Sequence, residues 1–211
     1  MASEIKQNLI LLNTENIRKI VLTNIIKMCI YRKYLDKEKW NQDKIDNFIK
    51  KKSIDNIYKL KLDNELPSKE NFINDEIIIT FFNTKINSIN NTPVVNDFIK
   101  NFNKSYKICI FLSISDKAYE LFNNLNNIEA FEEKFFMIDL QSHHCAPDYE
   151  VLNKEEIDNF KNDYNVNLLK MKQLLYSDPV VKYLNLSKGN IVRIIRKSMQ
   201  SGRSVDYRLV V

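Results

Sequence analysis

SDPVVKYLNLSKGNIVRIIRKSMQSGRSVDYRLVV, residues 177–211, is the stretch of this chain that says most about its structure. It contains the only two glycines of the 211-residue sequence, Gly189 and Gly202. Glycine takes positive φ angles without the steric cost that a Cβ atom brings, so a chain this poor in glycine keeps it for turns. We therefore expect two turns, which divide the stretch into a short helix and two strands.

The helix is expected to begin at Asp178, whose carboxylate can accept hydrogen bonds from the first turn. Pro179 suits the first helical position, because the N–H that it lacks would have no partner there. Gly189 is expected to release the chain from the helix. The β-branched run Ile191–Arg196 then predicts a strand. Residues 205–211 alternate apolar and polar side chains, which predicts a second strand that forms an antiparallel hairpin with the first.

Short motifs follow one another closely in this stretch: Asp178-Pro179-Val180, Gly189, Ile194-Ile195-Arg196, Gly202-Arg203 and Tyr207-Arg208-Leu209-Val210. In this order they resemble the C-terminal assembly domain of the fifth-largest subunit of eukaryotic DNA-directed RNA polymerases, a subunit that has a counterpart in archaeal polymerases. Upstream, Pro147 and the segment Leu152–Glu156 resemble the start of that domain and the helix after it. Earlier residues resemble the family only in layout.

The resemblance implies a non-catalytic structural subunit of a multisubunit DNA-dependent RNA polymerase. Its C-terminal domain would dock on the largest subunit, and its N-terminal jaw would lie near downstream duplex DNA. No catalytic residue, metal or cofactor is expected, because the polymerase chemistry would belong to the two largest subunits. The implied interface residues are Pro147, Asp178, Pro179, Gly189, Arg196, Gly202, Arg203, Tyr207 and Arg208, and the implied DNA-proximal residues are Ser113, Ser115 and Lys117.

Residues 1–141 are expected to hold helices first and then strands that alternate with helices. Ser115 or Asp116 is expected to cap one of these helices. The order predicts an α/β sheet covered by helices. The predicted helices span 14–34, 36–50, 94–103, 116–124 and 128–133, and the predicted strands span 57–62, 76–82, 107–112 and 134–140.

Two domains are expected, with a boundary near Gln141–Pro147. Residues 1–141 would form the α/β jaw domain, for which the resemblance implies a layout like that of restriction endonucleases. Residues 142–211 would form the small α+β assembly domain, which ends in the hairpin. The chain as a whole is therefore predicted to be α/β, or α+β overall.

The composition indicates a globular chain, with 44% hydrophobic and 28% charged residues. A net charge of +5 is compatible with a nearby polyanion but does not by itself indicate one. The spacing of Cys29, Cys109 and Cys145 suggests no disulfide, so we expect reduced thiols in an intracellular compartment. No secretory signal is recognised, and no apolar run approaches the ~20 residues of a membrane span.

The abundance of Asn, Ile and Lys reflects AT-rich codons. This bias fits a large DNA virus and an AT-rich protist alike. Departures from the family pattern, such as Tyr149 where the family usually has a histidine, favour the virus, which would place the protein in the virion and the host cytoplasm. A cellular origin would place it in the nucleus. The expected partners are the largest subunit, other core subunits and, weakly and without sequence preference, DNA. We expect neither membrane binding nor self-association.

His143-His144-Cys145 is the one cluster of metal-type ligands in the sequence. Adjacent residues rarely converge on one ion, and a structural zinc site needs a second ligand pair, so no metal is expected there. A metal-dependent nuclease would need converging carboxylates and a lysine. The candidate acids lie at predicted strand ends, where acidic residues usually serve solubility. They are Asp63, Glu65, Asp75 and Glu76. Nuclease activity therefore stays an unfavoured alternative.

Four arginines crowd the predicted hairpin: Arg193, Arg196, Arg203 and Arg208. Alternate positions of a ribbon face opposite sides, so one face can join the core while the other points outward. The planar guanidinium suits carboxylates and carbonyls of an interface, which favours docking. The alternative is a solvated edge whose charges block aggregation. For the whole protein, the competing hypothesis is a module that recruits transcription regulators without residing in the core enzyme.

Overall fold

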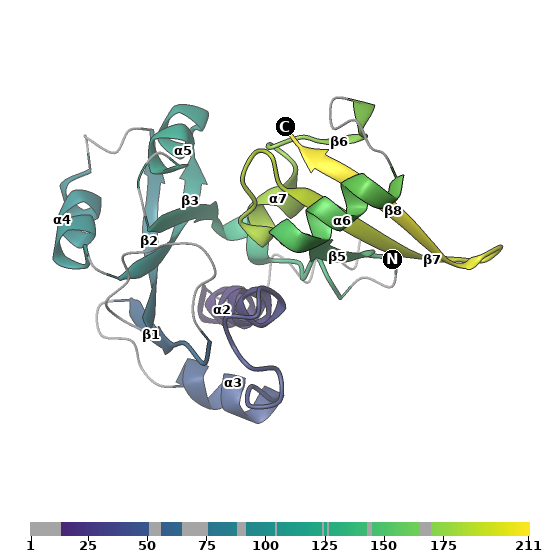
Figure 1. Ribbon diagram of the computed structural model, residues 1–211. Helices are drawn as coiled ribbons and strands as arrows, with labels where there is room; N and C mark the ends of the chain where they lie inside the picture. Colours follow the sequence, from purple (N-terminus) through teal and green to yellow (C-terminus); the bar gives the residue numbers. More distant parts are fainter. Residues whose placement is uncertain are drawn as a thin grey trace, which may run out of the picture. The chain divides into compact units, whose positions relative to one another are not determined.

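The computed structural model describes residues 14–50, 56–64, 76–87, 92–103, 105–123, 125, 127–142, 145–164 and 170–211. The chain divides into two compact units, Met1–Ile138 (unit 1) and Asp139–Val211 (unit 2), each with its own four-stranded sheet. Figure 1 shows the elements of both units. The described residues form a mixed helix and sheet structure, as the sequence predicts. Among them, no helix has the length and apolar character that crossing a bilayer requires.

Unit 1 contains a sheet with the strand order β1-β2-β3-β4. β1 pairs antiparallel with β2, and β2, β3 and β4 pair parallel. Parallel neighbours need crossover connections, which α4 and α5 supply. The strands are β1 (Ile57–Lys61), β2 (Glu76–Ile86), β3 (Tyr106–Ile114) and β4 (Ile128–Glu132). The helices are α2 (Thr14–Tyr31), α3 (Gln42–Lys50), α4 (Pro93–Asn101) and α5 (Asp116–Asn123).

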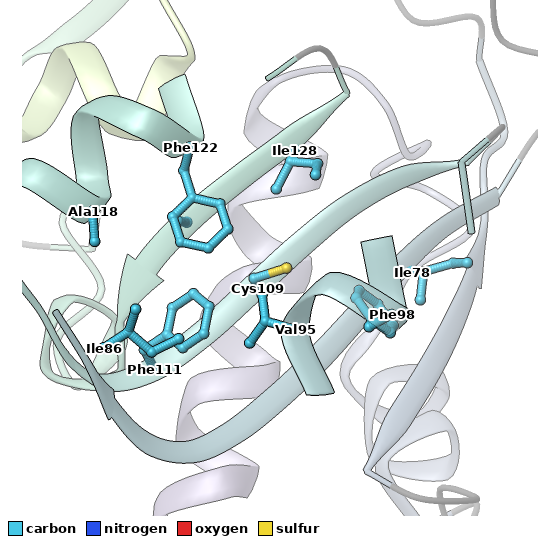
Figure 2. Close-up of a cluster of buried hydrophobic side chains, with 10 residues drawn as sticks. Ile78, Ile86, Val95, Phe98, Cys109, Phe111, Ala118, Phe122 and Ile128 are labelled. Atoms are coloured by element: carbon cyan, nitrogen blue, oxygen red, sulfur yellow. The ribbon is translucent and has the colours of Figure 1, made fainter. Parts of the chain in front are cut away.

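Helices cover both faces of this sheet. Figure 2 shows Val95 of α4 and Phe122 of α5 among the buried side chains that gather around Cys109 and Phe111 of β3. On the opposite face, the Phe81 ring of β2 contacts a run of aromatic rings that passes through β1 and α3. The strands are therefore buried on two sides, which explains why their sequences are apolar almost throughout.

The segment 128–140 differs from the prediction, which placed a helix over 128–133 and a strand over 134–140. Residues Ile128–Glu132 form strand β4, and Glu133–Phe136 form a 3₁₀ helix, η1. The reason is tertiary: β4 pairs with β3, which satisfies its backbone groups, and alternate side chains reach opposite faces of the sheet. The turn of η1 then packs Phe136 against Phe131, with ring centroids 4.9 Å apart.

Two other boundaries in unit 1 differ from the prediction. Helix α3 begins at Gln42 rather than at Asp36, because the Asp36 side chain accepts the Glu38 N–H at 3.0 Å and closes a turn there. Strand β2 continues to Ile86, four residues beyond the predicted end at Phe82. The remaining predicted helices and strands of unit 1 are present with shifts of a few residues at their ends.

Unit 2 contains a sheet with the order β5-β7-β8-β6. β7 and β8 pair antiparallel from Ile191↔Leu209 to Ser198↔Gly202. β5 pairs antiparallel with β7, and β6 pairs parallel with β8. The strands are β5 (Asp148–Val151), β6 (Gln173–Leu174), β7 (Ile191–Ser198) and β8 (Gly202–Val210). The helices are α6 (Lys154–Tyr164) and α7 (Pro179–Leu184).

A different helix packs on each face of this second sheet, and we name each face after its helix. On the α7 face, Val192 and Ile194 of β7 pack with Val181 of α7. On the α6 face, Ile191 packs with Phe160 of α6. This division follows from the strand period of two, since neighbouring residues of β7 point to opposite sides. The C-terminal residue is held as well, because the Val211 N–H donates to the Leu174 carbonyl at 3.0 Å.

Candidate docking surface

Helix α7 is held by local contacts at both ends. Asp178 Oδ1 accepts the Val180 N–H at 2.8 Å, and Pro179 occupies the first helical position, which confirms the predicted start. The predicted end at Gly189 is wrong: the helix closes at Asn185, in the left-handed region at φ +52°. Asn is one of the few residues that tolerate this conformation, because its short polar side chain can bond locally.

Both glycines have positive φ, as predicted; Gly189 lies in a turn, and Gly202 is the first residue of β8, directly after the hairpin turn. Gly189 has φ +91° and Gly202 has φ +68°. Gly189 also donates its N–H to the Val210 carbonyl at 2.9 Å, so this turn is tied to the last strand. Both glycines are exposed. Their contribution to any interface is therefore to shape the backbone around it.

An apolar cavity of about 240 Å³ opens within unit 2, between the start of β5 and helix α7. Of the implied interface residues, Pro147 lies in its wall, and Asp178 and Pro179 directly precede the wall residue Val180. A concave apolar site of this kind suits an apolar side chain of a partner. Its lining residues are Leu140, Gln141, Cys145, Ala146, Pro147, Tyr149, Val180, Tyr183 and Leu184.

The four arginines of the β7–β8 ribbon divide between its two faces. By the register, Arg193 and Arg203 lie on the α6 face, whereas Arg196 and Arg208 lie on the α7 face. Arg193 Nε donates to Glu150 Oε2 at 2.7 Å, and this hydrogen bond raises the pKa of Arg193. The alternation expected of a ribbon thus places one pair of arginines on each face.

The four arginines also differ in whether they form an ion pair. Arg208 lies 3.5 Å from Asp206, which also accepts a hydrogen bond from Lys172 at 2.9 Å. Arg196 and Arg203 are exposed and have no ion pair within the described part of the chain. The two arginines nearest the tip of the ribbon are therefore the ones free to contact another molecule.

Arg196 lies on the same face as the cavity. Asp148, the first residue of β5, pairs with Ile195 of β7 in an antiparallel register, so Pro147 and Arg196 are the next neighbours along the two strands. Tyr149, another wall residue, pairs with Ile194 on this face. An apolar cavity beside an exposed guanidinium combines hydrophobic burial with charge, which are the two components of many protein interfaces.

Tyr207 differs from the other implied interface residues, because much of its side chain serves the core. Its ring lies 4.3 Å from the Phe160 ring on the α6 face, and it also contacts Tyr164 at 6.2 Å. These contacts join β8 to α6. Tyr207 therefore stabilises the packing of α6 on the sheet, in addition to its implied role at the interface.

The implied DNA-proximal residues lie where β3 meets α5. Ser115 Oγ accepts the Ala118 N–H at 3.3 Å, which confirms the predicted cap, and donates to the Asn87 carbonyl at 2.9 Å. Ser113 Oγ lies 3.4 Å from Glu132 Oε1. Lys117 is exposed and has no polar partner among the described residues. Both serine hydroxyls thus have partners inside the protein, and Lys117 is the group that points to solvent.

The residues considered for metal binding or nuclease chemistry do not form a site in the described structure. His143, His144, Glu65 and Asp75 lie outside the described residues. The Asp63 carboxylate accepts Trp40 Nε1 at 2.9 Å. Burial opposes a low pKa for Asp63, but hydrogen bonds from Asp36 and Trp40 lower it. Within the described residues, no three His, Cys, Asp or Glu side chains come together as metal ligands.

A buried ion pair in unit 1 was not predicted. Arg32 donates to both carboxylate oxygens of Glu129, at 2.6 and 2.8 Å, and its side chain is 2% exposed. Burial opposes the charge on Arg32, but Glu129 raises its pKa. The Tyr106 hydroxyl also donates to Glu129, and burial raises the pKa of Tyr106. The residues are 97 positions apart, so no local signal could reveal the pair.

Comparison with known proteins assigns the chain to a family. Residues 138–210 match the family described as RNA polymerase Rpb5, C-terminal domain. The whole chain is similar to DNA-directed RNA polymerase subunit 5 of Acanthamoeba polyphaga mimivirus, with 32% identity over 197 residues, which cover 92% of this chain and 91% of that protein. This chain belongs to the Rpb5 family. The resemblance inferred from residues 178–211 is therefore confirmed.

Shorter similarities reach archaeal and cellular eukaryotic members. The archaeal subunit Rpo5 of Archaeoglobus fulgidus is 39% identical over 72 residues, which cover 34% of this chain and 95% of that protein. The subunit rpabc1 of RNA polymerases I, II and III from Dictyostelium discoideum is 32% identical over 84 residues, which cover 40% of this chain and 43% of that protein. The archaeal match is about as long as unit 2.

Proposed function

We propose that this chain is a non-catalytic structural subunit of a multisubunit DNA-dependent RNA polymerase. The observation that carries the proposal is its similarity, over 92% of the chain, to a viral polymerase subunit 5. Residues 142–211 form the assembly domain, and residues 1–141 form the jaw. A large DNA virus is the proposed source, with the virion and the host cytoplasm as the location.

The assembly domain docks on the largest subunit. The apolar cavity beside Arg196 supports this, because it joins an exposed cation to a concave apolar surface on one face of unit 2. The surface is shaped by Pro147 in the cavity wall and by the cap that Asp178 makes for α7. The implied interface residues at the ribbon tip, Gly202 and Arg203, form a second, basic contact.

Membership and docking are tested by purifying tagged protein from cells in which the polymerase assembles. Recovery of two very large polymerase chains in equal amounts supports membership in the core enzyme. Substoichiometric recovery contradicts it and favours the alternative, a module that recruits transcription regulators.

The cavity is tested with Val180→Asp, which places a charge in its wall. We expect a loss of at least tenfold in recovered large subunits, because a buried charge without a partner opposes docking. Val94→Asp is the matched control. Val94 follows a proline at the start of α4, as Val180 does at the start of α7, but Val94 is exposed and lies in unit 1. Equal recovery of the two variants would show that the cavity does not dock.

The jaw contacts downstream DNA weakly through Lys117, which lies in the first turn of α5, a few residues after Ser113 and Ser115. We predict that Lys117→Glu lowers the salt concentration at which assembled polymerase releases duplex DNA, with a change of about 1 in the salt-dependence slope for one lost phosphate contact. The control is Lys59→Glu, at an exposed lysine on β1. Unchanged retention in rising salt would place Lys117 away from DNA.

A further inference from the structure

Part of the outer edge of β8 has no partner strand among the residues that the structure describes. β8 pairs with β7 along its length, but with β6 only at Leu209 and Val210. The Leu209 N–H donates toward the β6 side, to the Lys172 carbonyl at 2.9 Å. Alternate residues of a strand direct their backbone groups to opposite edges, so those of Val205 and Tyr207 point to the β6 side as well. No described residue pairs with the Val205 N–H, or with the Val205 and Tyr207 carbonyls.

The surface around this edge is basic and partly apolar. Residues 196–205 include Arg196, Lys197 and Arg203, all exposed, and no acidic residue. Val205 is 48% exposed, and Met199 at the turn is fully exposed. Farther along β8, Asp206 pairs with Lys172 and Arg208 and so offsets part of the positive charge there. The excess positive charge is therefore concentrated where the edge is open.

We infer that the open edge of β8 binds an extended, acidic segment of another polymerase chain, which joins the sheet as an additional strand. This inference rests on the proposed function, because it assumes that unit 2 docks on another polymerase chain and adds the chemistry of the segment bound at the basic end of that surface. Strand addition to an exposed edge takes its affinity from backbone hydrogen bonds and its specificity from alternate side chains. The cations oppose pairing of two copies of this edge while they attract an acidic strand.

The backbone groups favour a peptide over a nucleic acid. The outward carbonyls of Val205 and Tyr207 need donors, whereas the Val205 N–H needs an acceptor. A peptide strand presents both in alternation, but phosphate oxygens only accept. The exposed Val205 side chain adds apolar contact area that a phosphate backbone does not use. A nucleic acid bound through its phosphates would therefore satisfy the charges of the ribbon and leave these carbonyls without partners.

The test is amide hydrogen exchange of residues 203–207 in the isolated protein and in the assembled polymerase without nucleic acid. We expect exchange of the Val205 amide to slow at least tenfold on assembly. If the large subunits copurify but this amide exchanges as in the isolated protein, the edge inference fails while the proposed function stands. If the amide is protected only after DNA or RNA is added, a nucleic acid is the occupant and the inference is also overturned.

Two variants make the test independent of any single change. Val205→Pro removes only an outward N–H, a substitution that edge strands tolerate, and circular dichroism checks its fold. Lys197→Glu with Arg203→Glu keeps the backbone and reverses the charge. We expect each to weaken assembly about tenfold, whereas Lys154→Glu, at an exposed lysine in the first turn of α6, leaves it unchanged. Full assembly by both test variants would overturn the inference.

Discussion

Arg32 and Glu129 show how much a single pair of residues contributes to unit 1. The pair links the turn directly after helix α2 to strand β4, and both side chains are nearly excluded from solvent, with 2% and 10% exposed. A buried ion pair is not in itself a gain over apolar packing, because both charges lose their hydration. Removing one member is costly, however, since the other charge then stays buried without compensation.

We predict that Glu129→Ala lowers the free energy of unfolding by about 3–5 kcal/mol, measured by urea denaturation. The control is Asp158→Ala, which removes the exposed pair with Lys161, whose atoms are 3.7 Å apart, and should change stability by less than about 1 kcal/mol. Similar losses in the two variants would mean that burial of the Arg32 charge does not govern the effect.

The three cysteines are expected to differ in reactivity, because two of them are buried and one is exposed. Burial raises the pKa of Cys29 and of Cys109 to about 12, whereas Cys145 is exposed. Because the thiolate is the nucleophile, iodoacetamide at pH 8 should modify only Cys145 in the folded protein and all three after unfolding, as read by mass spectrometry. Rapid native modification of Cys29 would contradict the buried geometry.

The same shifts predict a loss of stability in alkali. A folded-state pKa above the unfolded value gives stability that is present below the unfolded pKa and is lost as the pH rises through the folded one. For Cys29 and Cys109 this window runs from about 9 to about 12. The midpoint of urea denaturation should fall across that window. In a Cys29→Ala, Cys109→Ala double variant the fall should be smaller, and an unchanged fall would contradict the assignment.

Helix α7 is an element that depends on its surroundings. It has six residues, fewer than an isolated helix needs to be stable in water, so its cap and its packing on β7 hold it in place. The cap satisfies an N–H that would otherwise have no partner in the helix. Since α7 also forms part of the cavity wall, its position affects the docking surface.

We predict that Asp178→Ala lowers the free energy of unfolding by about 1 kcal/mol, because the Val180 N–H loses its acceptor. Asp178→Ser should recover most of this loss, since serine also caps helices well. Thermal denaturation of the three proteins measures both effects. If the serine variant is as unstable as the alanine variant, the carboxylate acts through its charge rather than as a cap.

On the scale of the whole molecule, unit 2 has the features of a domain that can stand alone. It has its own sheet, a helix on each face, and a last residue tied to β6. Archaeal relatives have a similar extent, since the match to the Archaeoglobus fulgidus protein covers 95% of its length in 72 residues. Domains of this size can bury enough surface to fold without a partner.

We predict that a fragment of residues 139–211 folds cooperatively, with a single thermal transition by circular dichroism and dispersed amide signals by NMR. Asp178→Ala should destabilise this fragment by about as much as it destabilises the full chain, because its contact lies wholly in unit 2. A fragment without a cooperative transition would mean that unit 2 needs residues of unit 1 to fold.

The sequence by itself determined the features whose physics is local. Asp178 and Ser115 each cap a helix a few residues away, and Gly189 and Gly202 take the positive φ angles that other residues avoid. The ordered motifs in residues 178–211 also identified the family. These signals act within a few positions of the chain, so they can be recognised before any fold is known.

Only the tertiary structure decided the rest. Residues 128–132 became a strand because β3 offered them partners, and the ion pair of Arg32 with Glu129 formed because the fold brought distant positions together. In each case the deciding interaction joins residues far apart in the chain, and its free energy exists only once the elements have packed.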